Sequence, residues 1–182
     1  IKTREIGDTE KLSEVWGKTA GELVKIYNNS PLKMTRKVLI ECFRQSVKYN
    51  KKNKTSWGQL GRQFFEIGDI PAAKIALKKS NNRYSLTTLG EIAELEGDKL
   101  SARSYYLKAL DLIKKLKDIK TERKVKELKS IAEKLLDMGF VEDAIDIYDN
   151  IKELLSGRAK VLIEAKVKFL KKKKRKIKEQ MV

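Results

Sequence analysis

The side chains that carry out most enzymatic chemistry are scarce in this chain. Its 182 residues include no histidine and a single cysteine, Cys42. Without an imidazole group, the usual catalytic triads and most zinc sites are excluded. Cys42 lies among Leu39, Ile40 and Phe43, so we expect a buried small side chain and not a reactive thiol. A lone cysteine cannot form an internal disulfide, which favours a reducing compartment.

Neither the carboxylates nor the glycines form a pattern typical of a catalytic site. Glu91 with Glu94, and Asp143 with Asp146, stand at helical spacing. Such pairs can bind a hard cation, but in a lysine-rich protein they are more typical of a solvated helix face. The stretch Gly58-Gln59-Leu60-Gly61 lacks the Lys-Ser/Thr pair that follows in a phosphate-binding loop. We therefore predict a protein that is not an enzyme and has no metal and no cofactor.

Basic residues are the chemical group in excess, and they gather in two segments. The chain has 42 basic and 25 acidic residues, a net charge of +17. Residues 32–56 hold eight basic residues against one acidic, and residues 158–182 hold eleven against two, whereas residues 57–157 hold 18 against 17. Clustered basic side chains bind phosphates, because neutralising phosphates releases condensed counterions. The predicted nucleic-acid-binding residues are Lys48, Lys51, Lys52, Lys54, Lys168, Lys171, Lys172, Lys173, Lys174, Arg175 and Lys176.

The two basic segments leave other interpretations open. Lysine-rich stretches also keep proteins soluble or act as localisation signals. A membrane surface is a weaker alternative, because the C-terminal basic segment carries no tryptophan anchor. Aromatic residues are not interleaved with the lysines, so any binding to RNA or DNA is predicted to be largely independent of sequence.

The elements that position these residues are predicted to be helices joined in hairpins. Three stretches align column by column, with a small residue, a glycine, an alanine and a large residue seven, five and four positions apart. Glycine is typical of a helix end, aspartate of the next helix start and proline of its first turn. The aligned residues are Gly61, Gly68, Ala73 and Leu77, then Gly90, Gly97, Ala102 and Tyr106, then Ala132, Gly139, Ala144 and Tyr148. Asp69 and Asp98 are the predicted N-caps, and Pro71 follows the first of them.

This pattern resembles the tetratricopeptide repeat (TPR), whose consensus is W-x2-L-G-x2-Y followed by A-x3-F. The best match is Trp57-x-x-Leu60-Gly61-x-x-Phe64. The resemblance implies an all-α fold, with antiparallel helix hairpins stacked as a short α-solenoid of about eight or nine helices. The proline that ends the family's repeat is absent from all three units.

The repeat spacing is irregular. The glycines Gly68, Gly97 and Gly139 stand 29 and 42 residues apart, where the family period is about 34. We interpret the short step as a second helix that ends at the turn Asn81-Asn82. The long step is interpreted as a second helix that extends from Leu100 through Ile119, because apolar residues recur there at helical spacing.

Three segments are predicted along the chain. Residues 1–55 form an N-terminal helical hairpin whose second helix is basic. Residues 56–157 form three TPR-like repeats, at 56–81, 83–119 and 122–156. Residues 158–182 form a basic capping helix followed by a lysine-rich tail.

The C-terminal segment begins with an amphipathic pattern. Leu162, Ala165 and Phe169 share one stripe of a helix, and Ile163, Val167 and Leu170 widen that stripe. We expect this half to cap the last repeat. Beyond it the lysine run has no apolar face, so it is expected to be solvated or to contact a polyanion.

The resemblance also implies a function. In the family, a concave groove lined by the first helix of each repeat holds another polypeptide. The residues placed there are Thr55, Gln59, Arg62 and Glu66 from the first repeat, Tyr84, Thr88 and Glu91 from the second, and Lys126, Lys129 and Glu133 from the third. Some relatives clamp a partner's C-terminal carboxylate with lysine, arginine and asparagine. The asparagines are missing here, so an extended or a helical peptide is left as the alternative ligand of the groove.

We therefore predict a non-enzymatic interaction scaffold or adaptor in a complex that contacts nucleic acid through its basic flanks. The alternative is a helical protein that binds RNA or DNA directly. No run approaches the roughly 20 apolar residues that cross a bilayer, so we expect a soluble cytoplasmic protein without a membrane partner. The sequence does not indicate an oligomeric state.

Overall fold

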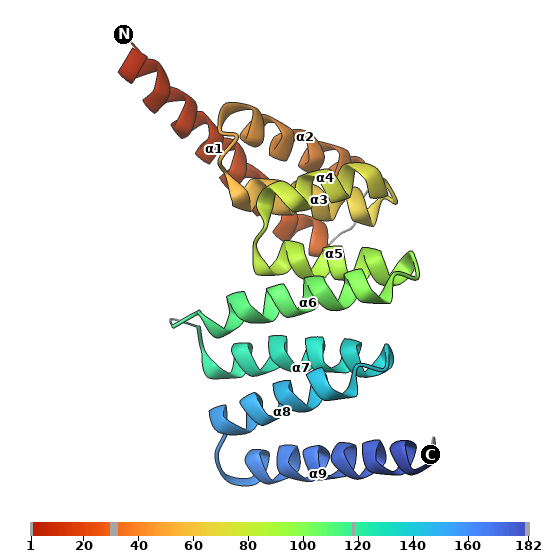
Figure 1. Ribbon diagram of the computed structural model, residues 1–182. Helices are drawn as coiled ribbons and strands as arrows, with labels where there is room; N and C mark the ends of the chain where they lie inside the picture. The colour runs from red at the N-terminus through yellow and green to blue at the C-terminus, as the bar shows by residue number, and fades with distance from the viewer. Residues whose placement is uncertain (1, 30–32, 118, 181–182) are drawn as a thin grey trace. The chain divides into compact units, whose positions relative to one another are not determined.

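The computed structural model describes residues 2–29, 33–117 and 119–180, and every regular element in these ranges is an α-helix (Figure 1). The helices are α1 (Lys2–Asn29), α2 (Lys33–Tyr49), α3 (Lys54–Glu66), α4 (Ile70–Ser80), α5 (Arg83–Leu95), α6 (Lys99–Lys114), α7 (Thr121–Asp137), α8 (Val141–Leu154) and α9 (Gly157–Gln180). The predicted all-α fold of antiparallel hairpins is confirmed. None of the helices in the described ranges is long and apolar enough to cross a membrane.

Two compact units divide the chain, Ile1–Ile92 and Ala93–Val182. The first holds α1 to α4 and most of α5, and the second holds the end of α5 and α6 to α9. Each unit is described separately. The division into an N-terminal hairpin, three repeats and a capping segment stays a prediction.

The hairpins turn at glycines with a left-handed backbone, as predicted. Gly68, Gly97 and Gly139 have φ angles of +82°, +77° and +92°. After α3, the backbone N–H of Gly68 donates to Phe65 and that of Asp69 donates to Phe64, which satisfies two carbonyls at the helix end. Only glycine adopts this backbone without strain.

The next helices begin at the predicted aspartates. The Oδ1 atom of Asp69 accepts a hydrogen bond of 3.1 Å from the backbone N–H of Ala72. Asp98 accepts a bond of 2.9 Å from Ser101 in the same way. Each carboxylate therefore caps one of the N–H groups that a helix start leaves without a helical partner.

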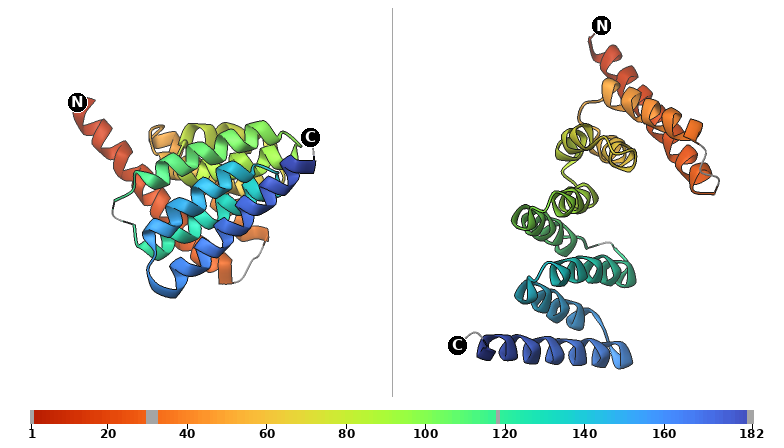
Figure 2. Two further views of the ribbon diagram at one scale, coloured as in Figure 1. Left: turned by 60° about the horizontal axis from the view of Figure 1, so that its bottom comes forward. Right: turned by 90° about the vertical axis from the view of Figure 1, so that its right-hand side faces the viewer.

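Helices α3 and α4 approach one another closely at Gly61. Figure 2 shows these two helices almost end-on, side by side in the first unit. A Cβ atom at Gly61 would lie 2.6 Å from Cγ of Leu77 and 2.9 Å from its backbone nitrogen. The missing side chain thus allows Leu77 to pack directly on the α3 backbone.

The structure confirms one interpretation of the irregular spacing and corrects the other. Helix α4 ends at Ser80, and Asn81 follows with a left-handed φ of 47°. Helix α6, however, ends at Lys114 and does not reach Ile119. The long interval is shared by α6, which has 16 residues against 11 in α4, by the longer connection after it, and by α7, which has 17 residues against 13 in α5.

The C-terminal end of α6 is capped by a cation from α7. The Nζ atom of Lys124, in α7, donates to the backbone oxygens of Lys114 at 3.2 Å and Leu116 at 3.3 Å. A cation satisfies carbonyls at a helix C-terminus and interacts favourably with the helix dipole.

The C-terminal segment also differs from the expectation. Helix α9 continues through the lysine run to Gln180, so this run is helical and is not a tail. The stripe that packs on α8 is Ile163, Val167 and Leu170, each less than 8% exposed. Only this part of the predicted amphipathic stripe packs on the last repeat, whereas Leu162 and Phe169 face solvent, 67% and 65% exposed.

Candidate functional site

A cleft of about 390 Å³ lies in the first unit, between α1 and α3. Two residues of the predicted groove, Thr55 and Gln59, line it from α3. The other lining residues were not predicted, and most come from α1. They are Glu14, Gly17, Lys18, Gly21, Val24, Phe43, Asn53 and Ser56.

Two glycines of α1 keep the cleft open. A Cβ atom at Gly17 would contact the hydroxyls of Ser56 and Ser46 at 3.4 and 3.5 Å. At Gly21 a Cβ atom would meet nothing within 4 Å. The α1 backbone is thus left bare at Gly21, where a ligand can approach it.

A buried hydrogen-bond network joins α1, α2 and the start of α3 behind this cleft. Ser13 Oγ donates to the backbone oxygen of Ser46 at 2.8 Å, and Ser46 Oγ donates to that of Ser13 at 2.8 Å. The Ser46 and Ser56 hydroxyl oxygens lie 2.8 Å apart. Since Ser46 gives its proton to Ser13, Ser56 is the donor in this last bond.

Asn53 completes the network as the N-cap of α3. Its Nδ2 group donates to Ser13 Oγ at 3.2 Å and to Ser46 Oγ at 3.3 Å. Its Oδ1 atom accepts from the backbone N–H of Ser56 at 3.1 Å. All four side chains are thereby satisfied, and they fix the register of the three helices around the cleft.

The remaining predicted groove residues of α3 form a charge cluster. Arg62 Nε lies 3.0 Å from Glu66 Oε1, one helical turn away. Arg36, from α2, lies 3.4 Å from the other oxygen of Glu66. Two cations therefore share one carboxylate, and Arg62 keeps an exposed side chain.

The predicted residues of α5 differ in accessibility. Thr88 is only 7% exposed, and its hydroxyl donates to the backbone oxygen of Tyr84 at 3.1 Å. Tyr84 is exposed, with the guanidinium of Arg83 4.1 Å from the centre of its ring. Glu91 is half-buried.

The predicted groove residues of α7 belong to the second unit. Lys126 is exposed and Lys129 is half-buried. Glu133 lies 3.8 Å from Lys166 of α9. A groove that includes α3, α5 and α7 together stays a prediction.

All four predicted nucleic-acid-binding lysines of the first basic segment, Lys48, Lys51, Lys52 and Lys54, are exposed. The turn of this segment is tied to α3, because Trp57 Nε1 donates to the backbone oxygen of Lys51 at 2.9 Å. The ammonium group of Lys79 lies 4.2 Å from the centre of the Trp57 ring. The indole therefore has a structural role.

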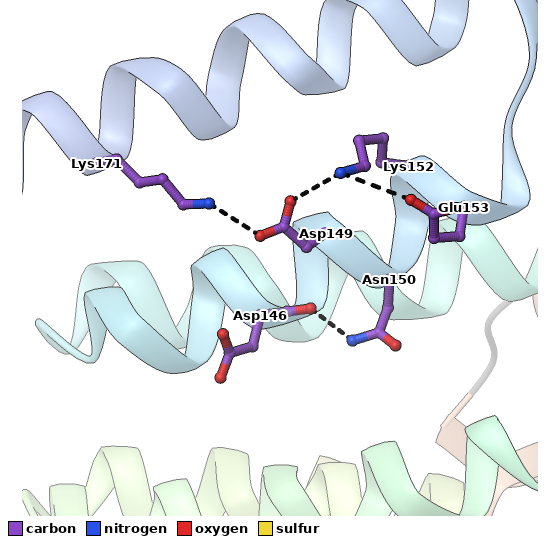
Figure 3. A network of polar contacts seen from close by, with 6 residues as sticks. All are labelled: Asp146, Asp149, Asn150, Lys152, Glu153 and Lys171. Atoms are coloured by element: carbon purple, nitrogen blue, oxygen red, sulfur yellow. Dashed lines mark hydrogen bonds and ion pairs between the residues drawn. The ribbon is translucent and has the colours of Figure 1, made fainter.

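The second basic segment is partly neutralised by α8. Lys171 donates to Asp149 Oδ2 at 3.2 Å, while Lys152 of α8 binds the other oxygen at 3.3 Å (Figure 3). Lys174 forms an ion pair with Glu142. The exposed basic side chains of this part of α9 that form none of these ion pairs with α8 are Lys168, Lys172, Lys173 and Arg175, and the side chain of Lys176 lies outside the described residues.

The ion pairs between α8 and α9 were not predicted from the sequence. The signal was available, because Glu142, Asp146 and Asp149 recur at intervals of four and three on α8. Two of these carboxylates, Glu142 and Asp149, form ion pairs with lysines of α9. A cleft of about 560 Å³ lies along this seam and includes Glu142, Asp146 and Lys174 in its lining.

Charge interactions in the second unit shift several pKa values. Partial burial acts to raise the pKa of Asp149, but hydrogen bonds from Lys171 and Lys152 outweigh it and hold the pKa below 3.8. The hydrogen bond with Asp143 raises the pKa of Arg103, whose Nη2 lies 2.8 Å from Asp143 Oδ1. This second pair links α6 to α8.

Solved structures share this fold at low sequence identity. One is a variant of the nearly identical TPR-like repeats of a putative kinesin light chain from Podospora anserina. It has a TM-score of 0.60 and 14% identity, over 94% of this chain and 93% of that chain. Another is MamA, with a TM-score of 0.52 and 18% identity, over 84% and 92% of the two chains. No protein-family model matches the chain, and neither does any curated protein. The chain thus has a TPR-like helical repeat fold, and the likeness establishes this fold alone.

Proposed function

We propose that the chain is a non-enzymatic scaffold or adaptor that binds a segment of another protein in the cleft between α1 and α3. The observation that carries the proposal is the composition of this cleft. Val24 and Phe43 supply an apolar floor, Gly21 leaves backbone accessible, and Thr55 and Gln59 supply polar groups at the rim. A few polar groups around an apolar floor are typical of a ligand site.

The cleft suits an extended or helical peptide of low net charge. The amide of Gln59 both donates and accepts hydrogen bonds, which fits the polar groups of a peptide. The rim charges, Glu14 and Lys18, lie 4.0 Å apart and cancel. An apolar side chain of the partner would pass between Glu14 and Lys18 and pack on the apolar floor.

The cleft wall is formed before a partner arrives. The network of Ser13, Ser46, Ser56 and Asn53 holds α1 and α3 in place. Preorganisation lowers the ordering cost of binding and leaves more of the contact energy as affinity.

Filling the cleft tests this function. Gly21→Leu places a side chain into the open space, and Gly7→Leu is the matched control, because Gly7 lies in the same helix, also with nothing near its Cβ position, and does not line the cleft. Capture from a nuclease-treated native extract is expected to yield a partner with the wild type and the control, but not with Gly21→Leu. Equal capture by all three proteins would remove the cleft as the site.

Contact with nucleic acid is the second part of the proposed function. It is supported by the exposed lysines of the turn after α2 and by the exposed basic side chains of α9. Affinity for an RNA and a DNA oligonucleotide, measured against salt, is expected to fall steeply, because each phosphate contact releases counterions. A flat salt dependence would leave the chain as a protein scaffold only.

The alternative, a direct RNA- or DNA-binding protein, predicts a different result from the same extract. All captured protein would then be lost on nuclease treatment, and Gly21→Leu would have no effect. Nuclease-resistant capture that depends on Gly21 favours the scaffold.

A further inference from the structure

Helix α9 carries a second apolar stripe that no described element covers. Leu162 and Phe169 are 67% and 65% exposed, and Val161 and Ala165 beside them are also exposed. The opposite face of the helix, with Ile163, packs on α8. Between Val161 and Leu170, helix α9 therefore has apolar side chains on two sides.

The spacing of the exposed stripe is that of a helix–helix seam. Leu162, Ala165 and Phe169 stand three and four residues apart, and Arg158 and Lys172 continue the same line at both ends. Alternating intervals of three and four are those of the a and d positions in a coiled coil. An outer helix of a repeat array that needs no neighbour has a polar outer face, which this helix lacks.

The charges around the stripe indicate the chemistry of its partner. Arg158, Lys168, Lys172 and Lys173 are exposed around the apolar residues. Lys171 and Lys174, in contrast, are engaged by carboxylates of α8. The stripe is thus an apolar core with a basic border, and it is complementary to an apolar seam with an acidic border.

The same charges disfavour a second copy of α9. The stripe is centred on Ala165, so an antiparallel copy would place Arg158 opposite Lys172 at both ends. Like charges in such positions oppose association. A phosphate backbone would meet the lysines but would leave Leu162 and Phe169 in water.

We propose that the exposed face of α9 is a docking site for an acidic amphipathic helix of a partner protein. The partner helix packs its apolar seam on Leu162, Ala165 and Phe169, and its carboxylates pair with the basic border. This site is separate from the cleft between α1 and α3 and does not depend on that cleft binding a peptide.

The test uses the full chain and two synthetic peptides. Each peptide has about three heptads with leucine at a and d, and one has glutamate at e and g where the other has lysine. Binding is followed by fluorescence anisotropy. The site is removed by Leu162→Ser with Phe169→Ser, and the matched control is Ile75→Ser with Leu100→Ser, which replaces two other exposed apolar residues of α4 and α6.

The acidic peptide is expected to bind at least about tenfold more tightly than the basic one. The α9 double variant is expected to lose about tenfold or more in affinity, since each apolar side chain contributes when it becomes buried. The control and Gly21→Leu are expected to bind as the wild type. Equal binding of both peptides, or an unchanged affinity of the α9 variant, would overturn the proposal.

Three further measurements address other occupants. Vesicles of phosphatidylserine and phosphatidylcholine, an RNA oligonucleotide, and self-association by sedimentation are each compared between wild type and the α9 double variant. The proposal expects no dependence on Leu162 and Phe169 in any of them. If one of the three depends on these residues while the acidic peptide does not, the occupant is a membrane, a nucleic acid or a second copy, and the proposal is wrong.

Discussion

The Nζ atom of Lys171 lies 3.2 Å from Oδ2 of Asp149, which joins the lysine-rich part of α9 to the acidic side of α8. Asp149 also accepts from Lys152 of its own helix. The carboxylate thus lies between two ammonium groups from different helices. The contact adds an electrostatic component to the apolar packing of Ile163, Val167 and Leu170, and it turns the exposed face of α9 away from α8.

Acid is expected to remove this component. Because the pKa of Asp149 is held below its ordinary value of 3.8, the ionised carboxylate stabilises the folded state above that pH. The contribution is lost as the pH falls through the lower folded pKa. Asp149→Asn should therefore lower Tm at pH 7 by no more than about 2–4 °C, as expected for a partly exposed ion pair.

The difference in Tm between wild type and Asp149→Asn is the quantity to follow against pH. It should be largest near neutrality and should disappear only once the pH has fallen below the lowered pKa of Asp149, where the wild-type carboxyl also becomes neutral. A difference that stays constant down to that pH would show that the substitution acts through packing and not through charge.

Two glycine substitutions are expected to change stability in opposite directions. Gly61→Ala places a Cβ atom against the backbone nitrogen of Leu77 at 2.9 Å, so α3 and α4 must separate, at a cost of about 1–3 kcal/mol. Gly21→Ala meets nothing within 4 Å and replaces a glycine inside a helix, which should stabilise by up to about 1 kcal/mol. Urea unfolding of both variants shows whether each substitution lowers or raises the free energy of unfolding. Equal effects would contradict the close approach at Gly61.

The serine network is expected to be costly to disrupt. Ser46→Ala removes the group that donates to Ser13 and accepts from Ser56 and Asn53. Buried polar groups left without partners cost about 1–3 kcal/mol. Ser104→Ala, at an exposed position of α6, is the control and should change stability by less than about 0.5 kcal/mol. If both variants unfold at the same urea concentration, the network does not stabilise the fold.

The turns of the repeats could be predicted because their determinants are local. A glycine that must adopt a positive φ and an aspartate that must cap the next helix occur within a few residues of one another, as at Gly68 and Asp69. The end of α6 could not be found in this way. Apolar residues continue at helical spacing to Ile119, while the cation that caps the end of the helix is Lys124, which belongs to α7.

The face that α9 buries could not be predicted from periodicity either. Leu162, Ala165 and Phe169 form as good a stripe as Ile163, Val167 and Leu170. Which stripe becomes buried depends on α8, whose carboxylates bind Lys171 and Lys174. Only the stripe of Ile163, Val167 and Leu170 lies on the same side of α9 as these two lysines. Similarly, Thr55 and Gln59 were predicted on the basis of the repeat, but the α1 side of their cleft rests on hydrogen bonds between residues 33 positions apart.

The lysines of α9 are expected to separate into two groups with different roles. Lys171→Gln with Lys174→Gln removes the cations that α8 binds, and Lys172→Gln with Lys173→Gln removes exposed cations from the same run. Both changes lower the net charge by two. The first pair should lower Tm and increase hydrogen exchange in α9, while the second should leave both unchanged.

Oligonucleotide binding should show the opposite order. Loss of Lys172 and Lys173 should weaken affinity and reduce the slope of log affinity against log salt by roughly 1.4–1.8, about 0.7–0.9 for each phosphate contact. Loss of Lys171 and Lys174 should change the slope less, because α8 already neutralises them. Since the two double variants carry the same charge, net charge alone predicts identical slopes. Identical slopes together with identical Tm values would contradict the division of the run into a structural pair and a binding pair.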